Sequence, residues 1–131
     1  MRPEIASIVG DWLKKAAVDL RTAEVVLAAD PPIVEDALFH CQQAAEKAMK
    51  AFLTAHDKPF HKTHDLDELA SACEAIVPEL RDALDPAREL SVFAWHFRYP
   101  GEVEVPEPGE AHGAIRTARR VCEAIESRLL S

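Results

Sequence analysis

Glycine is scarce in this chain, with only four among its 131 residues, and aromatic side chains make up just 6%. The alternation of apolar and polar residues that marks half-buried strands is also missing. Apolar residues instead recur every three to four positions along most of the chain, which is the period of an amphipathic helix. The sequence therefore argues against a β protein and predicts an all-α fold.

Cysteine is also rare, and the three residues are far apart at Cys41, Cys73 and Cys122. None belongs to a CxxC pair, and each falls at an apolar position of a helical pattern. This excludes a disulfide framework and gives no support to a cysteine metal site. We expect three buried free thiols in a protein from a reducing compartment.

Long hydrophobic runs are missing as well. No segment has 18 or more uncharged apolar residues, so we expect no membrane span. Lys14 and Lys15 follow the first apolar residues rather than precede them, which is the wrong order for a signal peptide. These features predict a cytoplasmic protein with a single domain over residues 1–131.

Positive charge is depleted, since the net charge is −8 and no lysine follows Lys62. A protein that coats DNA needs a basic surface, so this function is excluded. The segment from Lys47 to His64 is different, because it holds four lysines, three histidines and one acidic residue, Asp57. We expect a locally positive site there, on an otherwise acidic protein.

The helical pattern and its start and stop signals predict an antiparallel up-and-down bundle of four long helices plus a short fifth. Asp-Pro pairs at Asp30 and Asp85 are typical of helix starts, and Pro59 and Pro100 are typical of breaks. We expect helices over about 5–29, from Asp30 to about His56, from Thr63 or Asp65 to Val77, from Asp85 to the break at 99–101, and from about Glu110 onward, with a short helical piece at 79–84.

Three stretches are familiar when taken together: FHCQQAAEKAMKAFL (39–53), KPFHKTHDLDEL (58–69) and FAWHFRYPG (93–101), with DWLKKAAVDLRTAEVVL (11–27) ahead of them. In this order they resemble the HEPN domain family of prokaryotic helical proteins, over nearly the whole chain. The resemblance implies a bundle of four to five helices that is often a homodimer. It also implies a partner, because many family members pair with a minimal nucleotidyltransferase in toxin–antitoxin systems. Other members are metal-independent ribonucleases.

The ribonuclease branch of the family carries an arginine, four to six intervening residues and then a histidine. Histidine can move a proton near neutral pH, and arginine can stabilise the charge that develops on phosphorus. Arg98 matches the family's arginine, but no histidine follows at that spacing, and the next one is His112. Arg88 and His96 are separated by seven residues, which also misses the pattern. This departure predicts a module that binds a nucleotide or a partner rather than cutting RNA. The alternative is a metal-independent endoribonuclease that uses Arg98 with a histidine supplied by the fold, His64 or His96.

The candidate ligand-binding residues lie on one helix and in the loop after it. Gln43, Lys47 and Lys50 share one helix face by their spacing, and the start of the third helix offers backbone N–H groups that favour phosphate. A solvated face and a loop-and-cap role for the histidines remain open alternatives. The full predicted set is Gln43, Lys47, Lys50, Lys62, Thr63, His64 and Arg98.

The nearest approach to a metal motif is the HxxH spacing of His61 and His64. A zinc site needs three or four ligands, and no cysteine pair supports these two. The sequence contains no GxSxG, P-loop or GxGxxG motif. We therefore expect no metal site and no cofactor.

Overall fold

A computed structural model describes residues 1–94 and 106–129, and within these ranges the chain forms helices and loops with no strand. The all-α prediction is therefore confirmed for this part of the chain. Within the described residues, three α-helices are long and two are short. The α-helices are α1 (Pro3–Leu27), α2 (Val34–Ala55), α3 (Leu66–Ile76), α4 (Arg81–Leu84) and α5 (Pro108–Leu129), and two 3-10 helices, η1 (Pro78–Leu80) and η2 (Asp85–Ala94), flank α4.

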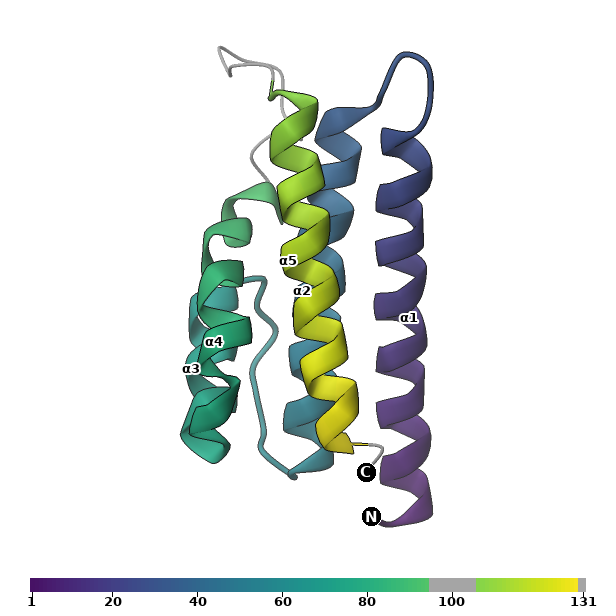
Figure 1. Ribbon diagram of the computed structural model, residues 1–131. Helices are drawn as coiled ribbons and strands as arrows, with labels where there is room; N and C mark the ends of the chain where they lie inside the picture. The colour runs from purple at the N-terminus through teal and green to yellow at the C-terminus, as the bar shows by residue number, and fades with distance from the viewer. Residues whose placement is uncertain (95–105, 130–131) are drawn as a thin grey trace.

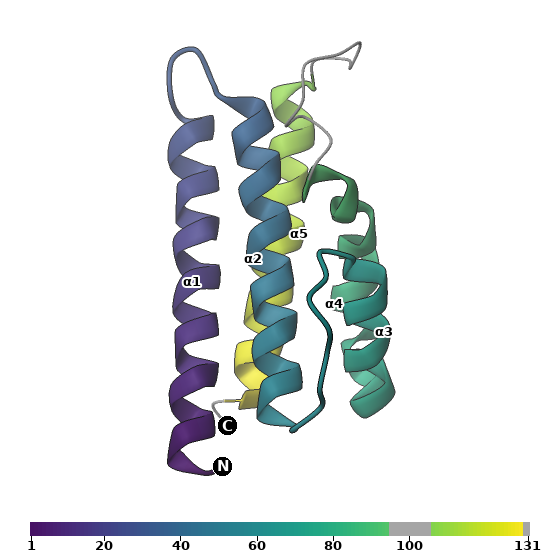
Figure 2. The same ribbon diagram turned by 180° about the vertical axis from the view of Figure 1, so that it is seen from behind.

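The helices α1, α2 and α5 lie side by side with their axes nearly aligned (Figures 1 and 2). A second group, made of α3, α4 and η2, packs on the side of α2 and α5 that is away from α1 (Figures 1 and 2). The long helix α1 runs opposite to α2, but α2 and α5 run in the same direction (Figure 1). An extended segment after α2 carries the chain back along the bundle before α3 begins (Figure 2). The predicted antiparallel bundle of four long helices is therefore not confirmed.

The prediction of a fourth long helix from Asp85 needs correction. Its described part, Asp85–Ala94, is a 3-10 helix, and the rest of the expected helix lies outside the described residues. A 3-10 helix has three residues per turn, which brings Arg88 over Asp85. The Nε atom of Arg88 donates to Oδ1 of Asp85 at 3.0 Å, while its other nitrogens reach Asp67 and Glu74 from α3. This side chain favours the tighter winding by joining η2 to α3.

The predicted start of the second helix at Asp30 is also wrong, because α2 begins at Val34. A residue that precedes proline is disfavoured in the α conformation, and both Asp30 and Pro31 precede a proline. The chain instead makes a short connection in which the N–H of Ile33 donates to the carbonyl of Val26 at 2.9 Å. This bond ties the start of α2 to the end of α1.

The end of α2 is a Schellman motif centred on Asp57, which has a positive φ of 53°. The N–H of Lys58 donates to the carbonyl of Leu53 at 2.9 Å, and the N–H of Asp57 donates to that of Thr54 at 3.1 Å. This pair of bonds satisfies carbonyls that a helix end leaves free. The helix thus ends before Pro59, the residue that the sequence indicated as the stop.

The core is centred on α2, which contacts every long element of the bundle. Its small side chains are fully buried and let neighbouring helices approach closely: Ala44, Ala45, Ala48 and Ala51. On α1 the buried apolar positions are Val9, Ala16, Ala23 and Leu27. The apolar periodicity of this helix predicts that Ile8 also faces inward, but Ile8 is exposed. The inner face of α1 is therefore rotated toward Val9.

All three cysteines are free and buried, as predicted. Burial in apolar surroundings raises the pKa of each thiol, Cys41, Cys73 and Cys122, to about 12. A thiol with so high a pKa carries almost no thiolate at neutral pH, and the thiolate is the nucleophile. These residues therefore pack as small apolar side chains.

Candidate functional site

Glu46 lies in the middle of α2 and is only 3% exposed, yet it carries a carboxylate. Three donors hold it: Nε2 of Gln42 and Nζ of Lys50, each at 3.0 Å, and Nδ1 of His64 at 2.7 Å. Burial acts to raise the pKa of Glu46, but the hydrogen bonds from Gln42, His64 and Lys50 outweigh it, so the pKa lies below its ordinary value. Glu46 is therefore a buried anion that organises its neighbours. We call Glu46, Gln42, Lys50 and His64 the Glu46 network.

Gln42 extends the Glu46 network to the backbone and to a second amide. Its Nε2 also donates to the carbonyl of His64 at 3.2 Å, and its Oε1 accepts from Nε2 of Gln43 at 2.6 Å. Among the described residues, no buried polar side-chain atom lacks a partner. A fully satisfied polar network is rigid, because every rearrangement leaves a buried group unpaired. Sequence reasoning missed Gln42, although its i,i+4 spacing to Glu46 signals the pair.

Lys50 is 6% exposed and is enclosed by aromatic rings as well as by its carboxylate partner. Its Nζ lies 5.6 Å from the ring centroid of Trp12 on α1 and 5.7 Å from that of Phe60 in the loop after α2. A cation over an aromatic face is attracted by the ring's quadrupole. Lys50 thus joins α1, α2 and the loop, and Glu46 balances its charge.

Lys47 belongs to a different cluster, centred on the buried carboxylate of Asp19 from α1. Oδ2 of Asp19 accepts from Nζ of Lys47 at 2.5 Å, and Oδ1 lies 2.8 Å from Nδ1 of His40. The single polar face predicted from Gln43, Lys47 and Lys50 is therefore divided between two carboxylates. Sequence reasoning missed Asp19, whose only signal is a charge between Ala16 and Ala23 on the inner stripe of α1.

His64 is the exposed member of the Glu46 network, with 62% of its side chain accessible. Nδ1 is fixed on Glu46, while Nε2 has no partner among the described residues. The neighbouring Lys62 is exposed and also has no hydrogen bond or ion pair within the described parts of the chain. Thr63 lies between them and accepts a bond from the N–H of Asp65 at 3.0 Å. The loop thus presents one oriented imidazole and one unpaired ammonium.

Two of the backbone N–H groups at the start of α3, which the sequence suggested for phosphate, are already bonded within the protein. The N–H of Leu66 donates to Oγ of Ser91 at 2.7 Å, and that of Asp67 donates to Oδ1 of Asp65 at 2.9 Å. Asp65 is therefore the N-cap, one of the two caps predicted. Its carboxylate also disfavours an anion at this helix end. A ligand phosphate would have to rely on side chains instead.

The histidines near the site are engaged with carboxylates. Nε2 of His61 lies 3.0 Å from Oε1 of Glu68, and His64 contacts Glu46. Within residues 1–94 and 106–129, no group of three or more His, Cys, Asp or Glu residues could hold a metal ion. The other two predicted site residues, His96 and Arg98, lie outside the described residues.

The fold and the site define a small all-helical module built around a buried carboxylate network. The HEPN domain family model matches residues 9–128, which is most of the chain. This protein therefore belongs to the HEPN domain family, whose members are nucleotide-binding or ribonuclease-type modules. Comparison with curated proteins and with solved structures gave no significant match. None of the helices described combines the length and the apolar character needed to cross a bilayer.

Proposed function

We propose that this protein is a non-catalytic HEPN module that binds a nucleotide through the loop before α3. One observation carries the proposal: buried Glu46 holds the imidazole of His64 by Nδ1, while 62% of that side chain stays exposed. In its imidazolium form His64 donates through Nε2 as well as through Nδ1, and the unpaired ammonium of Lys62 supplies a second donor for a phosphate group. Arg98, the family's arginine position, is the third proposed contact.

The lysines of α2 have a supporting role in this proposal. Lys47 and Lys50 are paired with Asp19 and Glu46, so their charges are already balanced. Moving either lysine toward a ligand would leave a buried carboxylate without its partner, which is costly. They therefore position the network, and Lys62 and His64 face the ligand.

A small ligand fits the charge distribution better than a long nucleic acid. The protein has a net charge of −8, and a duplex needs many phosphate contacts spread over a basic surface. The exposed donors at His64 and Lys62 cover only one or two phosphate groups. A nucleotide with its phosphates at one end matches this limited site.

Titration calorimetry with ATP and GTP tests this proposal. We expect the wild type to bind and His64→Gln to bind about tenfold more weakly, since one charge-assisted contact is lost. His61→Gln is the matched control, because His61 is an exposed histidine of the same loop that pairs with Glu68 instead. Equal affinities of wild type and His64→Gln would contradict the proposal.

A second candidate function is a metal-independent endoribonuclease, and the pairing of His64 with Glu46 favours it. A buried carboxylate that orients an imidazole is the arrangement used when histidine acts as a general base or acid. In this version Arg98 stabilises the phosphorane, and His64, or the other candidate His96, moves the proton. Incubation of the protein with tRNA in EDTA tests it. Cleavage that is lost in Arg98→Ala and His64→Ala supports the enzyme, and intact RNA rules it out.

We also propose that the protein forms a homodimer and pairs with a minimal nucleotidyltransferase in a toxin–antitoxin-type system. Family membership suggests these partners, and α1 supplies an apolar surface for protein contact. Ile8, Val18 and Val25 are all exposed and fall within about 100° of one another around α1, at roughly 100° per residue. Sedimentation of the wild type and of a Val18→Asp, Val25→Asp variant tests the dimer. A monomeric wild type would contradict it.

A further inference from the structure

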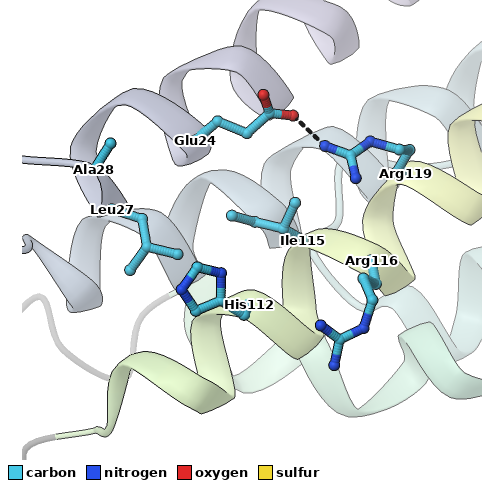
Figure 3. Close-up of a pocket in the computed structure, with 7 residues that line it drawn as sticks. All are labelled: Glu24, Leu27, Ala28, His112, Ile115, Arg116 and Arg119. Atoms are coloured by element: carbon cyan, nitrogen blue, oxygen red, sulfur yellow. Dashed lines mark hydrogen bonds and ion pairs between the residues drawn. The ribbon is translucent and has the colours of Figure 1, made fainter.

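A pocket of about 360 Å³ lies between the C-terminal end of α1 and the N-terminal half of α5. Its volume falls in the range of small-molecule sites. Seven residues line it: Glu24, Leu27, Ala28, His112, Ile115, Arg116 and Arg119 (Figure 3). None of them belongs to the Glu46 network, so this is a separate site.

The pocket brings together several nitrogen-bearing side chains of α5. His112, Arg116 and Arg119 follow i, i+4, i+7 spacing, which places them along one side of the helix (Figure 3). Arg119 is paired with Glu24 across the gap to α1. Arg116 and His112 have no hydrogen bond or ion pair with any residue that the structure describes. One carboxylate therefore stands against two guanidinium groups, and the pocket has a surplus of positive charge.

The other wall of the pocket is aliphatic. Leu27 is the last residue of α1, Ala28 follows it, and Ile115 belongs to α5. The imidazole of His112 faces Leu27 across the opening (Figure 3). Among the lining residues that the structure describes, there is no Phe, Tyr or Trp on which a nucleobase could stack. The lining therefore suits a hydrocarbon body attached to an anionic head.

We infer that this pocket binds a small organic anion with an aliphatic body, a carboxylate or a phosphate monoester. The anion pairs with the guanidinium of Arg116, which forms no ion pair with a carboxylate of the described residues, and the anion accepts a hydrogen bond from His112. The hydrocarbon part packs on Leu27 and Ile115. Glu24 opposes the ligand, because it holds Arg119 and adds a negative charge to the pocket.

Calorimetric titration with sodium hexanoate and with butyl phosphate tests this inference and separates the two anion types. We expect Arg116→Gln to weaken the binding of the preferred probe about tenfold, the loss of one charge-assisted contact. Glu24→Gln should tighten it, because Arg119 is released and a repulsive charge is removed. The matched control is Arg120→Gln, an exposed arginine of the same helix that does not line the pocket. Hexylamine, with the same hydrocarbon body and the opposite charge, should not bind.

Two results would overturn the inference. The first is that neither anion gives a heat of binding at millimolar concentrations. The second is that Arg116→Gln and Glu24→Gln leave the affinity unchanged. Circular dichroism of each variant establishes that it is folded, which is expected because Arg116 and Glu24 are both exposed. Nucleotide binding at His64 is measured separately, so either proposal can fail without the other.

Discussion

Nδ1 of His64 lies 2.7 Å from Oε1 of Glu46, so an exposed imidazole in a loop is tied to a carboxylate buried in α2. The bond spans 18 positions of sequence and fixes the loop against the bundle. It also leaves only one ring nitrogen of His64 available to a ligand. The position of this histidine and the proton on its Nδ1 are therefore held by a buried carboxylate.

Glu46→Gln should destabilise the protein by about 3 kcal/mol, because Lys50 is then left buried without its opposite charge. Chemical unfolding followed by circular dichroism measures the loss. Glu68→Gln is the control, since Glu68 is an exposed partner of His61 and its removal should cost well under about 1 kcal/mol. Equal stabilities of the two variants would show that the buried pair contributes nothing.

The same carboxylate predicts how stability depends on pH. Because the folded pKa of Glu46 is lowered from 4.5, the folded state holds its proton less tightly than the unfolded state does. Its contribution to stability is present above pH 4.5 and is lost as the pH falls through the folded pKa. Unfolding measured from pH 7 to pH 3 should therefore show a shallower acid loss in Glu46→Gln than in the wild type. Parallel curves would be inconsistent with this account.

Arg88 is expected to hold η2 against α3. Its guanidinium donates to Glu74 at 2.9 Å and to Ser71 at 3.0 Å, and it also contacts Asp67. Arg88→Ala should cost roughly 2 kcal/mol, because buried Glu74 loses a charged donor. Arg81→Ala provides the comparison, since Arg81 is largely exposed and lies 3.6 Å from the same carboxylate. A thermal unfolding midpoint that falls equally in both variants would contradict the difference.

The three thiols should be unreactive in the folded protein. Burial raises the pKa of Cys41, Cys73 and Cys122 to about 12, and each side chain is closed to solvent by its neighbours. A thiol reagent such as DTNB should modify none of them in buffer and all of them in denaturant. Rapid modification of one cysteine under native conditions would show that its part of the core opens.

Asp57→Gly should stabilise the protein by about 0.5–1 kcal/mol, because glycine accepts the positive φ at the end of α2 without strain. Asp57→Ala should act in the opposite direction, since alanine has neither that freedom nor a local hydrogen bond. Denaturant midpoints of the two variants measure the effect. Stability changes of the same sign in both variants would contradict this prediction.

Much of the fold could be predicted from the sequence, because helical periodicity and caps are local. The bounds of α1, the cap at Asp65 and the burial of the cysteines all follow from neighbouring residues. The start of α2 and the 3-10 winding of η2 could not be predicted so simply. The first depends on two successive prolines, and the second depends on Arg88 reaching α3.

Part of the site was also predictable, because helical spacing and helix caps are local features of the sequence. Spacing placed Lys47 and Lys50 on one helix, and the THDL stretch placed His64 at the start of the next. The carboxylate with which each cation pairs depends on tertiary packing, that is, on the positions of α1 and of the loop after α2. Asp19 and Gln42 were therefore missed, and two of the N–H groups expected to bind phosphate at the start of α3 are instead bonded to Ser91 and Asp65.

The proposal of nucleotide binding at His64 is tested most directly by the imidazole nitrogen resonances of the ¹⁵N-labelled protein during titration with ATP. We expect the Nε2 signal of His64 to shift with saturation, the Nδ1 signal to stay in place because it remains bonded to Glu46, and the signals of His61 to change little. A His64 spectrum that ATP leaves unchanged would contradict the central claim.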